Sequence, residues 1–294
     1  MQRKNSALKL ILTLALPLCW LLVSCETFKP ENEIPSYIHI DEIKLNTTFS
    51  SEGTNSNKIT DAWVYIDDQQ IGVFELPATF PVIFSGKHKL KIMAGVKMNG
   101  VAATRISYPF YKSYEQEIDL ELTKTDTIKP SVNYQPGVKF AFMEDFETAG
   151  IKLEKTLVSD TGIYQVSGSD LVFEGSFSGG IFLDDKHIIA KISSTSLSPF
   201  SIPSNSPVFL EMDYKNNQKF NVGIIIKYPS MSESNAFLTI NPSAAWNKIY
   251  LNLTEEINNY PGATGYYLYI TAAKENNIVA PAIFIDNLKI VQFK

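Results

Sequence analysis

The string from Glu117 to Glu121 places a carboxylate at every second residue. Alternate residues of a β-strand share one face, so three carboxylates would line the same surface. Two carboxylates about 5 Å apart are what a retaining glycoside hydrolase needs. A half-exposed strand with acidic residues outside and Ile or Leu inside gives the same string, and a Thr- and Pro-containing stretch follows it. We therefore favour the plain strand and expect no enzyme activity.

Tyrosines gather at residues 260–269, directly after a pair of asparagines. Tyr260, Tyr266 and Tyr267 are the candidate ligand-binding residues, because aromatic rings near loop ends can stack on sugar rings while neighbouring amides bind hydroxyl groups. The alternative is an ordinary strand with tyrosines on both faces, which we favour.

The composition excludes several classes of function. Two cysteines cannot build a disulfide scaffold or a multi-Cys zinc site. The three histidines, His39, His88 and His187, are scattered at no metal-ligand spacing. Lys and Arg number 26 against 31 Asp and Glu, so there is no basic excess to neutralise phosphates. We therefore expect no nucleic-acid partner.

The N-terminus indicates an exported protein. Basic residues precede the apolar run 10–23, which is shorter than the about 20 residues of a membrane span and fits a secretory signal. The run ends in Leu-Val-Ser-Cys, which resembles the lipobox of bacterial lipoproteins. The resemblance implies cleavage before Cys25 and lipid attachment to its sulfur. The alternative is an ordinary signal peptide with an incidental cysteine.

Residues 1–24 are thus the expected signal peptide and residues 25–35 a tether. The acidic residues after Cys25 resemble the charged tether of Bacteroidetes outer-membrane lipoproteins, so we expect a lipid-anchored outer-membrane protein that faces the periplasm or the cell surface. Cleavage removes three of the 26 basic residues and none of the 31 acidic ones, which leaves a net charge of −8. An acidic body is repelled by anionic membrane surfaces.

From residue 36 onward the pattern is that of β-strands, and no segment of 12 residues shows a helical period. Apolar runs on both sides of Asp67-Asp68 predict a hairpin, and Pro81 predicts an edge strand or a loop. Residues 208–214 alternate, with Phe209, Glu211 and Asp213 on one face and apolar residues and Tyr214 on the other. Residues 222–226 are continuously apolar, as in a strand buried on both faces. The sequence therefore predicts an all-β protein.

A length of 294 residues suggests about two domains. The Thr-, Lys- and Pro-rich segment 124–136 predicts a linker between residues 36–123 and residues 137–294. Trp63 and Trp246 each lie in an alternating apolar strand, which predicts core packing for both.

The first domain resembles the PEGA-type, Ig-like sandwiches of bacterial surface lipoproteins. The resemblance rests on Val64–Asp68, Ile71-Gly72, Leu76-Pro77 and Gly86–Leu90, which follow a strand–turn–Gly, Pro, Gly-x-His-x-Leu order. It implies a spacer or adhesion role over residues 36–123.

The second domain resembles galactose-binding-like jelly rolls. Met143–Glu147 and Ala282–Ile290 are similar to the first and last strands of that superfamily, and Trp246–Leu253 is similar to its Trp-containing strand. Many of its members are carbohydrate-binding modules, so the resemblance implies a β jelly-roll sandwich over residues 137–294 and a glycan as the ligand.

Many relatives in that superfamily also hold a structural Ca²⁺ where the first and last strands pair. The resemblance implies that this pairing brings together Glu144, Asp145, Glu147 and Asp286, whose hard oxygen ligands suit Ca²⁺. Solvated acids at strand ends are the alternative, and we favour it because the spacing forms no defined loop motif.

The sequence thus predicts a lipid-anchored, all-β envelope protein that consists of a small Ig-like sandwich followed by a jelly roll. Its expected function is non-catalytic binding of glycan. The alternatives are a structural or adhesion subunit that contacts another envelope protein, and a glycoside hydrolase that uses Glu117 and Glu121. The expected partners are the membrane, through the lipid, and a polysaccharide or an envelope protein, and the one cofactor considered is structural Ca²⁺.

The lipid anchor has a direct test. We expect Cys25→Ala to move the protein from the membrane fraction to the soluble fraction, because stable anchoring requires more than one acyl chain and this substitution removes the attachment point. Fractionation of cells that express the full chain measures this. A variant that still sediments with membranes would contradict the anchor.

Overall fold

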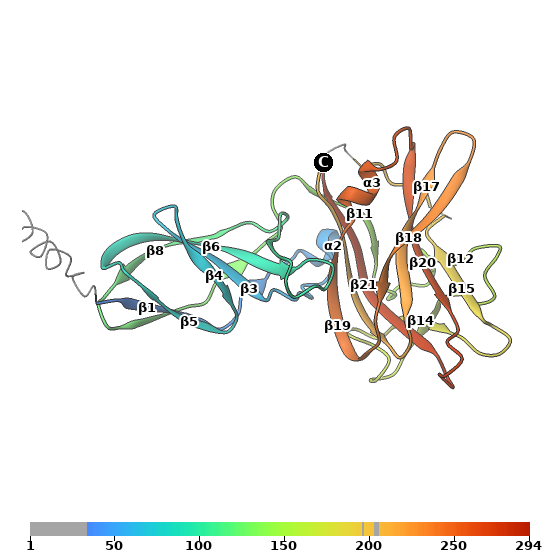
Figure 1. Cartoon of the computed structure of the whole chain (residues 1–294), viewed down its shortest axis with the longest axis horizontal. Coiled ribbons are helices and arrows are strands. Elements are labelled where there is room, and N and C mark those ends of the chain that lie inside the picture. The colour runs from blue at the N-terminus through green and yellow to red at the C-terminus, as the bar shows by residue number, and fades with distance from the viewer. Residues whose placement is uncertain (1–33, 196, 203–205) are drawn as a thin grey trace, which may run out of the picture.

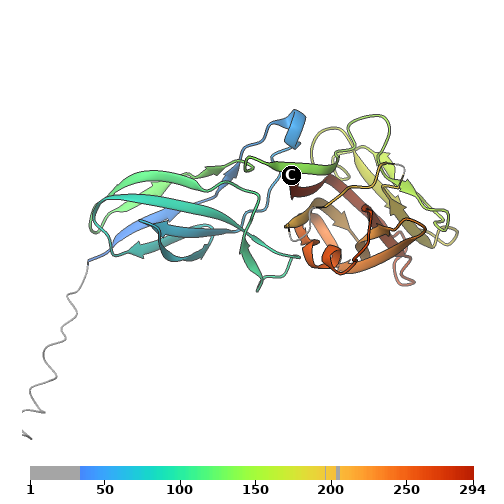
Figure 2. The same cartoon turned by 90° about the horizontal axis from the view of Figure 1, so that it is seen from above.

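The computed structural model describes residues 34–195, 197–202 and 206–294. Two β-sandwiches lie end to end, and the described chain begins at the end of the first sandwich that points away from the second (Figures 1 and 2). This confirms the all-β prediction. Cys25 lies outside the described residues. No helix within the described ranges has the length and apolar character needed to cross a membrane.

The first unit, the N-terminal sandwich, is built from ten short strands. These are β1 (Ser36–Ile40), β2 (Lys44–Leu45), β3 (Asp61–Ile66), β4 (Gln69–Glu75), β5 (Ala78–Val82), β6 (Gly86–Lys97), β7 (Arg105–Ser107), β8 (Tyr114–Leu120), β9 (Thr125–Ile128) and β10 (Ser131–Val132). A four-residue helix, α2 (Phe49–Glu52), lies between β2 and β3. One layer has the order β5-β1-β9, the other β4-β3-β6-β7 with β8 on β6, and β2 pairs with β10.

Local sequence rules hold well in this unit. Asp67 and Asp68 have φ values of 49° and 63°, as a two-residue type I′ hairpin turn requires, and they join β3 to β4. Pro81 lies in β5, which is at the edge of its sheet and pairs with β1. Both predictions are confirmed. The Ig-like assignment of the unit stays a prediction.

The segment 124–136 differs from the expected linker, because it contains β9 and β10. These strands run parallel to β1 and β2 and belong to the N-terminal sandwich. Ile128 and Val132 are buried in its core. Each strand contributes one buried aliphatic residue, and Pro130 lies between the two strands. The exposed Thr and Lys residues dominate the composition of the segment, so the sequence pattern does not indicate the strands.

The second unit, the jelly roll, contains the remaining strands. These are β11 (Val138–Glu144), β12 (Glu154–Lys155), β13 (Tyr164–Val166), β14 (Ser178–Phe182), β15 (Ile189–Ser193), β16 (Val208–Asn216), β17 (Phe220–Lys227), β18 (Ser232–Ile240), β19 (Ser243–Asn252), β20 (Gly265–Ala273) and β21 (Ala282–Phe293), with the helix α3 (Thr254–Asn258) after β19. The six-stranded sheet has the order β13-β14-β21-β16-β19, with β11 also on β21, and the five-stranded sheet the order β12-β15-β20-β17-β18. The first and last strands, β11 and β21, pair antiparallel as predicted.

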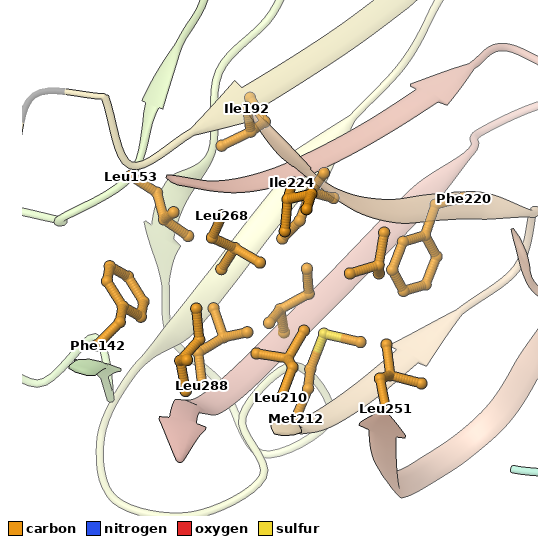
Figure 3. Packing of buried hydrophobic residues seen from close by; sticks show 14 of the residues in the cluster. Phe142, Leu153, Ile192, Leu210, Met212, Phe220, Ile224, Leu251, Leu268 and Leu288 are labelled. Atoms are coloured by element: carbon orange, nitrogen blue, oxygen red, sulfur yellow. The ribbon is translucent and has the colours of Figure 1, made fainter. Parts of the chain in front are cut away.

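The core of the jelly roll lies between these two sheets (Figure 3). On β21, Ile285 and Leu288 both point into this core, with two residues between them instead of one. The pairing of β21 with β16 shifts register at this point, and Asn287 has a φ of 47°. A bulge of this kind re-aims side chains. It places Asp286 and Asn287 together on the outer face of the sheet.

The continuous apolar run on β17 is covered on both sides, which confirms its prediction. Ile224 packs in the core between the sheets, and Ile225 packs on the outer face with Tyr267 and Tyr269. Gly223 allows β18 to approach closely at a register shift, since a Cβ there would lie 1.9 Å from the carbonyl oxygen of Asn235.

The N-terminal sandwich covers part of the outer face of the six-stranded sheet. Phe209, Tyr250 and Val291 belong to the jelly roll, yet they lie in the hydrophobic cluster of the other unit. The ring centroid of Tyr108 is 5.4 Å from that of Phe209 and 4.9 Å from that of Tyr250. The two sandwiches therefore share a packed interface, whereas a spacer on a linker would leave this sheet open.

We expect Gly223→Ala to destabilise the jelly roll by about 1–3 kcal/mol, because the new methyl group must displace backbone and not a flexible side chain. The matched control is Gly162→Ala, where the nearest atom would be a side-chain atom at 3.5 Å. Urea unfolding followed by tryptophan fluorescence measures both. Equal urea midpoints for the two variants would show that β17 and β18 accommodate the methyl group without loss of stability, and would contradict the prediction.

Candidate functional site

The interface between the sandwiches contains a buried carboxylate. Glu211 is 0% exposed on the outer face of β16. The Tyr108 hydroxyl donates to one of its oxygens at 2.8 Å, and the Tyr134 hydroxyl lies 3.0 Å from both. Burial, with the nearby carboxylate of Glu211, raises the pKa of both tyrosines well above 10, so both hydroxyls stay protonated donors.

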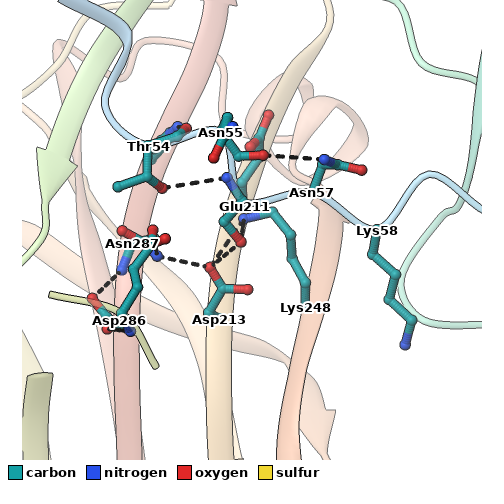
Figure 4. Close-up of polar contacts among 12 residues, drawn as sticks. Thr54, Asn55, Asn57, Lys58, Glu211, Asp213, Lys248, Asp286 and Asn287 are labelled. Carbon is teal, nitrogen blue, oxygen red and sulfur yellow. Dashed lines mark hydrogen bonds and ion pairs between the residues drawn. The ribbon is translucent and has the colours of Figure 1, made fainter. Parts of the chain in front are cut away.

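A second buried carboxylate lies two residues along the same strand (Figure 4). One oxygen of Asp213 accepts hydrogen bonds from the Ser56 hydroxyl at 2.7 Å and the Asn287 amide at 3.1 Å, and Lys248 Nζ is 3.3 Å away. Ser56 belongs to the N-terminal sandwich and the other partners to the jelly roll. Asp213 therefore holds the segment that follows α2 against the six-stranded sheet.

A cleft of about 590 Å³ opens beside this interface, and we call it the junction cleft. The N-terminal sandwich and the jelly roll both line it. The lining residues are Thr47, Phe49, Thr54, Asn55, Asp145, Glu147, Glu174, Gly175, Asp286 and Asn287. Four of them carry carboxyl groups and none carries a positive charge. A volume of this size is typical of a small-molecule site.

Glu147 is fixed in the wall of the junction cleft by one of its two oxygens. Oε1 accepts hydrogen bonds from the backbone N–H groups of Ser176 and Phe177, both at 2.9 Å. Gly175 makes this approach possible, because a Cβ there would lie 2.4 Å from the same oxygen and the residue has a φ of 74°. No described residue donates to Oε2, so it is available to a ligand.

Asp145 and Glu174 are held in the same manner. Asp145 Oδ1 accepts from the backbone N–H of Glu147 at 3.2 Å, and Glu174 Oε1 accepts from the Asn287 amide at 2.7 Å. Their second oxygens have no hydrogen-bond donor among the described residues. No described Lys, Arg or His forms an ion pair with Asp145, Glu147, Glu174 or Asp286.

Asp286 is the most buried of the four acids, at 1% exposed. Burial raises its pKa to about 8, and the neighbouring carboxylates of Asp213 and Glu174 act in the same direction, against the backbone N–H groups of Asn287 and Glu174. At neutral pH this carboxyl group is therefore largely protonated and can donate a hydrogen bond, unlike an ionised carboxylate.

The structure brings the predicted acidic residues together without making them a metal site. Asp145, Glu147 and Asp286 line the junction cleft. Glu144 lies apart, since its two oxygens accept from the backbone N–H groups of Phe146 at 2.8 Å and Lys152 at 2.6 Å. Within the described ranges, no group of three or more His, Cys, Asp or Glu residues is placed to hold a metal ion. The residues do not fit the Ca²⁺ site that the resemblance implied.

The predicted tyrosines do not share one surface. Tyr260 and Tyr266 line a cleft of about 360 Å³ near α3, where the Tyr266 hydroxyl donates to the Ile257 carbonyl at 3.1 Å. Tyr267 lies on the opposite face of β20 and is 8% exposed. Successive residues of a strand point to opposite faces, so Tyr266 and Tyr267 cannot contact one ligand.

The alternating string on β8 is a half-buried strand. Ile118 and Leu120 are buried, whereas Glu117 and Asp119 are exposed, and Glu121 forms an ion pair with Lys124. This arrangement supports the structural interpretation over the catalytic one.

Neither tryptophan packs in a core, contrary to the prediction. Trp63 and Trp246 are half-buried, and neither belongs to the main hydrophobic clusters. The ring of Trp246 lies on the six-stranded sheet, 5.7 Å from that of Phe173.

The residues that the N-terminal sandwich contributes to the junction cleft, above all Phe49, were not predicted from the sequence. One signal was present. Phe49 is the single aromatic residue in a run of Thr, Ser, Asn, Gly and charged residues at positions 46–58, where nothing in the pattern gives it a core to enter.

No family model matches the chain, and no curated protein matches it. Among solved structures, the CBM22-1 xylan-binding domain of Paenibacillus barcinonensis Xyn10C aligns at 11% identity and a TM-score of 0.37, over 54% of this chain and 98% of that one. A structure of carbohydrate-binding modules from the β-sandwich superfamily aligns at 14% identity and a TM-score of 0.37, over 89% and 99%. The family 30 module of a Clostridium thermocellum cellulase aligns at 11% and 0.35, over 51% and 89%. At these values the alignments assign no ligand to this chain.

The raised pKa of Asp286 predicts a pH-dependent stability. Between the ordinary pKa of 3.8 and about 8 only the folded state holds this proton, so the residue makes the free energy of unfolding fall as the pH rises through that window. We expect Asp286→Asn to remove this pH-dependent contribution to the free energy of unfolding. The free energy of unfolding of the variant minus that of the wild type should therefore increase from pH 5 to pH 8.

Urea midpoints at pH 5, 6, 7 and 8 measure the difference between the two proteins. The control is Asp119→Asn, which changes an exposed acid on β8. A difference for Asp286→Asn that stays constant over the four pH values would show that the carboxyl group is ionised in the folded protein.

Proposed function

We propose that this chain is a lipid-anchored envelope protein that binds glycan without cleaving it, and that the glycan lies in the junction cleft. One observation carries the proposal. Asp145, Glu147 and Glu174 are each fixed by one oxygen and leave the second without a donor, in a cleft that also holds the exposed ring of Phe49.

The chemistry of the lining suits a polyhydroxylated ligand. Ionised carboxylates make short, strong hydrogen bonds to hydroxyl groups. The amide of Asn55 can both donate and accept, whereas both N–H groups of the Asn287 amide already donate to Glu174 and Asp213, so its oxygen is left to accept. Fixed partners lose little conformational freedom on binding, which favours affinity.

The charge of the lining restricts the class of glycan. Four acidic residues and no positively charged residue line the junction cleft, and the chain as a whole has a net negative charge. An anionic ligand would meet like charges there, which costs affinity. We therefore propose neutral polysaccharides as the ligand class.

Anchoring through Cys25 is part of the same proposal. About ten residues separate Cys25 from β1 and can span at most about 35 Å when extended. β1 begins at the end of the N-terminal sandwich that points away from the jelly roll (Figure 1). The tether and the N-terminal sandwich together would hold the junction cleft away from the membrane.

A hydrolase is the second candidate, and Asp286 is the observation that favours it. A protonated carboxyl group next to ionised ones is the arrangement that glycosidases use as acid and nucleophile or base. Asp286 is 1% exposed, however, and a general acid must reach the glycosidic oxygen, so we place binding first.

The test is native affinity electrophoresis of the full mature chain in gels that contain xylan, β-1,4-galactan or mixed-linkage β-glucan, with and without Ca²⁺. We expect at least one polysaccharide to retard the protein. Glu174→Gln should weaken retention about tenfold or more, since a hydrogen bond to a charged group contributes about 1.5–3 kcal/mol. Glu121→Gln, an exposed acid on the other sandwich, is the matched control.

Absence of retardation in all three gels would overturn glycan binding. Equal retention of the wild type and Glu174→Gln would place the ligand elsewhere on the molecule. Release of reducing ends from the retarding polysaccharide, lost in Asp286→Asn, would favour the hydrolase.

A further inference from the structure

Phe49 is exposed without a structural reason. Its side chain is 61% exposed on α2, and this helix buries none of its residues. An exposed aromatic ring gains nothing for folding, whereas at the rim of a cleft it offers an apolar surface to a ligand.

The backbone around Phe49 is held in place on both sides. Glu52 Oε2 accepts from the backbone N–H of Thr48 at 2.7 Å, which closes the turn of α2, and the Thr47 hydroxyl donates to the Gly53 carbonyl at 2.9 Å. Gly53 has a φ of 71°, a left-handed conformation that favours glycine.

The same segment is attached to the jelly roll. Lys289 Nζ donates to the Thr54 carbonyl at 2.7 Å, and Ser56 donates to the buried Asp213. Burial lowers the pKa of Lys289 to about 8. These contacts fix the position of Phe49 relative to the six-stranded sheet, although the residue belongs to the other sandwich.

Phe49 borders two clefts. The junction cleft lies on one side, and a second cleft of about 180 Å³ shares Phe49, Thr54, Asp145 and Asn287 with it. The residues that line the two clefts differ in charge. Lys152 and Lys289 line the second cleft, whereas no positively charged residue lines the junction cleft.

We infer that the two clefts are neighbouring subsites of one groove and that Phe49 is the ring on which a sugar unit between them stacks. The inference rests on the proposed function and deepens it. The ligand is then an oligosaccharide of at least three units, and the N-terminal sandwich supplies a specificity-determining residue. Binding requires both sandwiches.

The inference is tested by calorimetry on the full mature chain. The probes are the disaccharide and the hexasaccharide of whichever of the three polysaccharides retards the protein; for xylan these are xylobiose and xylohexaose. We expect the hexasaccharide to bind about tenfold or more tightly than the disaccharide. Phe49→Ala should weaken hexasaccharide binding about tenfold or more, because burial of an aromatic ring is lost, and Phe49→Tyr should restore it.

The matched control is Tyr164→Ala, which removes another exposed aromatic ring, 52% exposed, outside both clefts. Thermal midpoints of Phe49→Ala and the wild type should agree, since the ring is exposed. Wild-type affinity in Phe49→Ala, or equal affinity for both probes, would overturn the inference and leave the proposed function standing. A wild type that no polysaccharide retards overturns both.

Discussion

The arrangement of the two sandwiches depends on the burial of two carboxylates, Glu211 and Asp213, on the outer face of one sheet. A buried charge without partners costs several kcal/mol. Both donors to Glu211, Tyr108 and Tyr134, come from the N-terminal sandwich, and Ser56 of that sandwich donates to Asp213 beside its jelly-roll partners Lys248 and Asn287. Glu211 has these hydrogen-bond donors only when the other sandwich lies in this position. The polar interface therefore favours one arrangement of the two sandwiches, and that arrangement also shapes the junction cleft beside it.

Sequence periodicity predicted which residues share a face but not what covers the face. The alternation at residues 208–214 places Glu211 and Asp213 opposite Leu210 and Met212, as the structure shows. Acidic residues on an outer strand face normally meet water. Here Glu211 contacts Tyr108, 103 residues earlier in the chain, and Asp213 contacts Ser56, 157 residues earlier, and no local pattern encodes such contacts.

The candidate site was predictable to the same limited extent. The pairing of β11 with β21 could be expected, and it brings Asp145 and Glu147 close to Asp286. Glu174 lies on a loop and Phe49 on the short helix α2, and the positions of both depend on tertiary contacts. The carboxylates look like metal ligands in the sequence because spacing does not show that backbone N–H groups already occupy one oxygen of Asp145, one of Glu147 and both of Glu144.

The interface also explains why the two sandwiches act as one binding unit. A buried ionic network contributes little net stability compared with well-packed apolar residues, but it tolerates few alternative geometries. Three hydrogen bonds from Ser56, Asn287 and Lys289 fix the segment beside α2 relative to the bulge on β21. A ligand that touches both Phe49 and the jelly-roll acids would therefore meet a groove that is already formed, and it would not have to bring two mobile domains together.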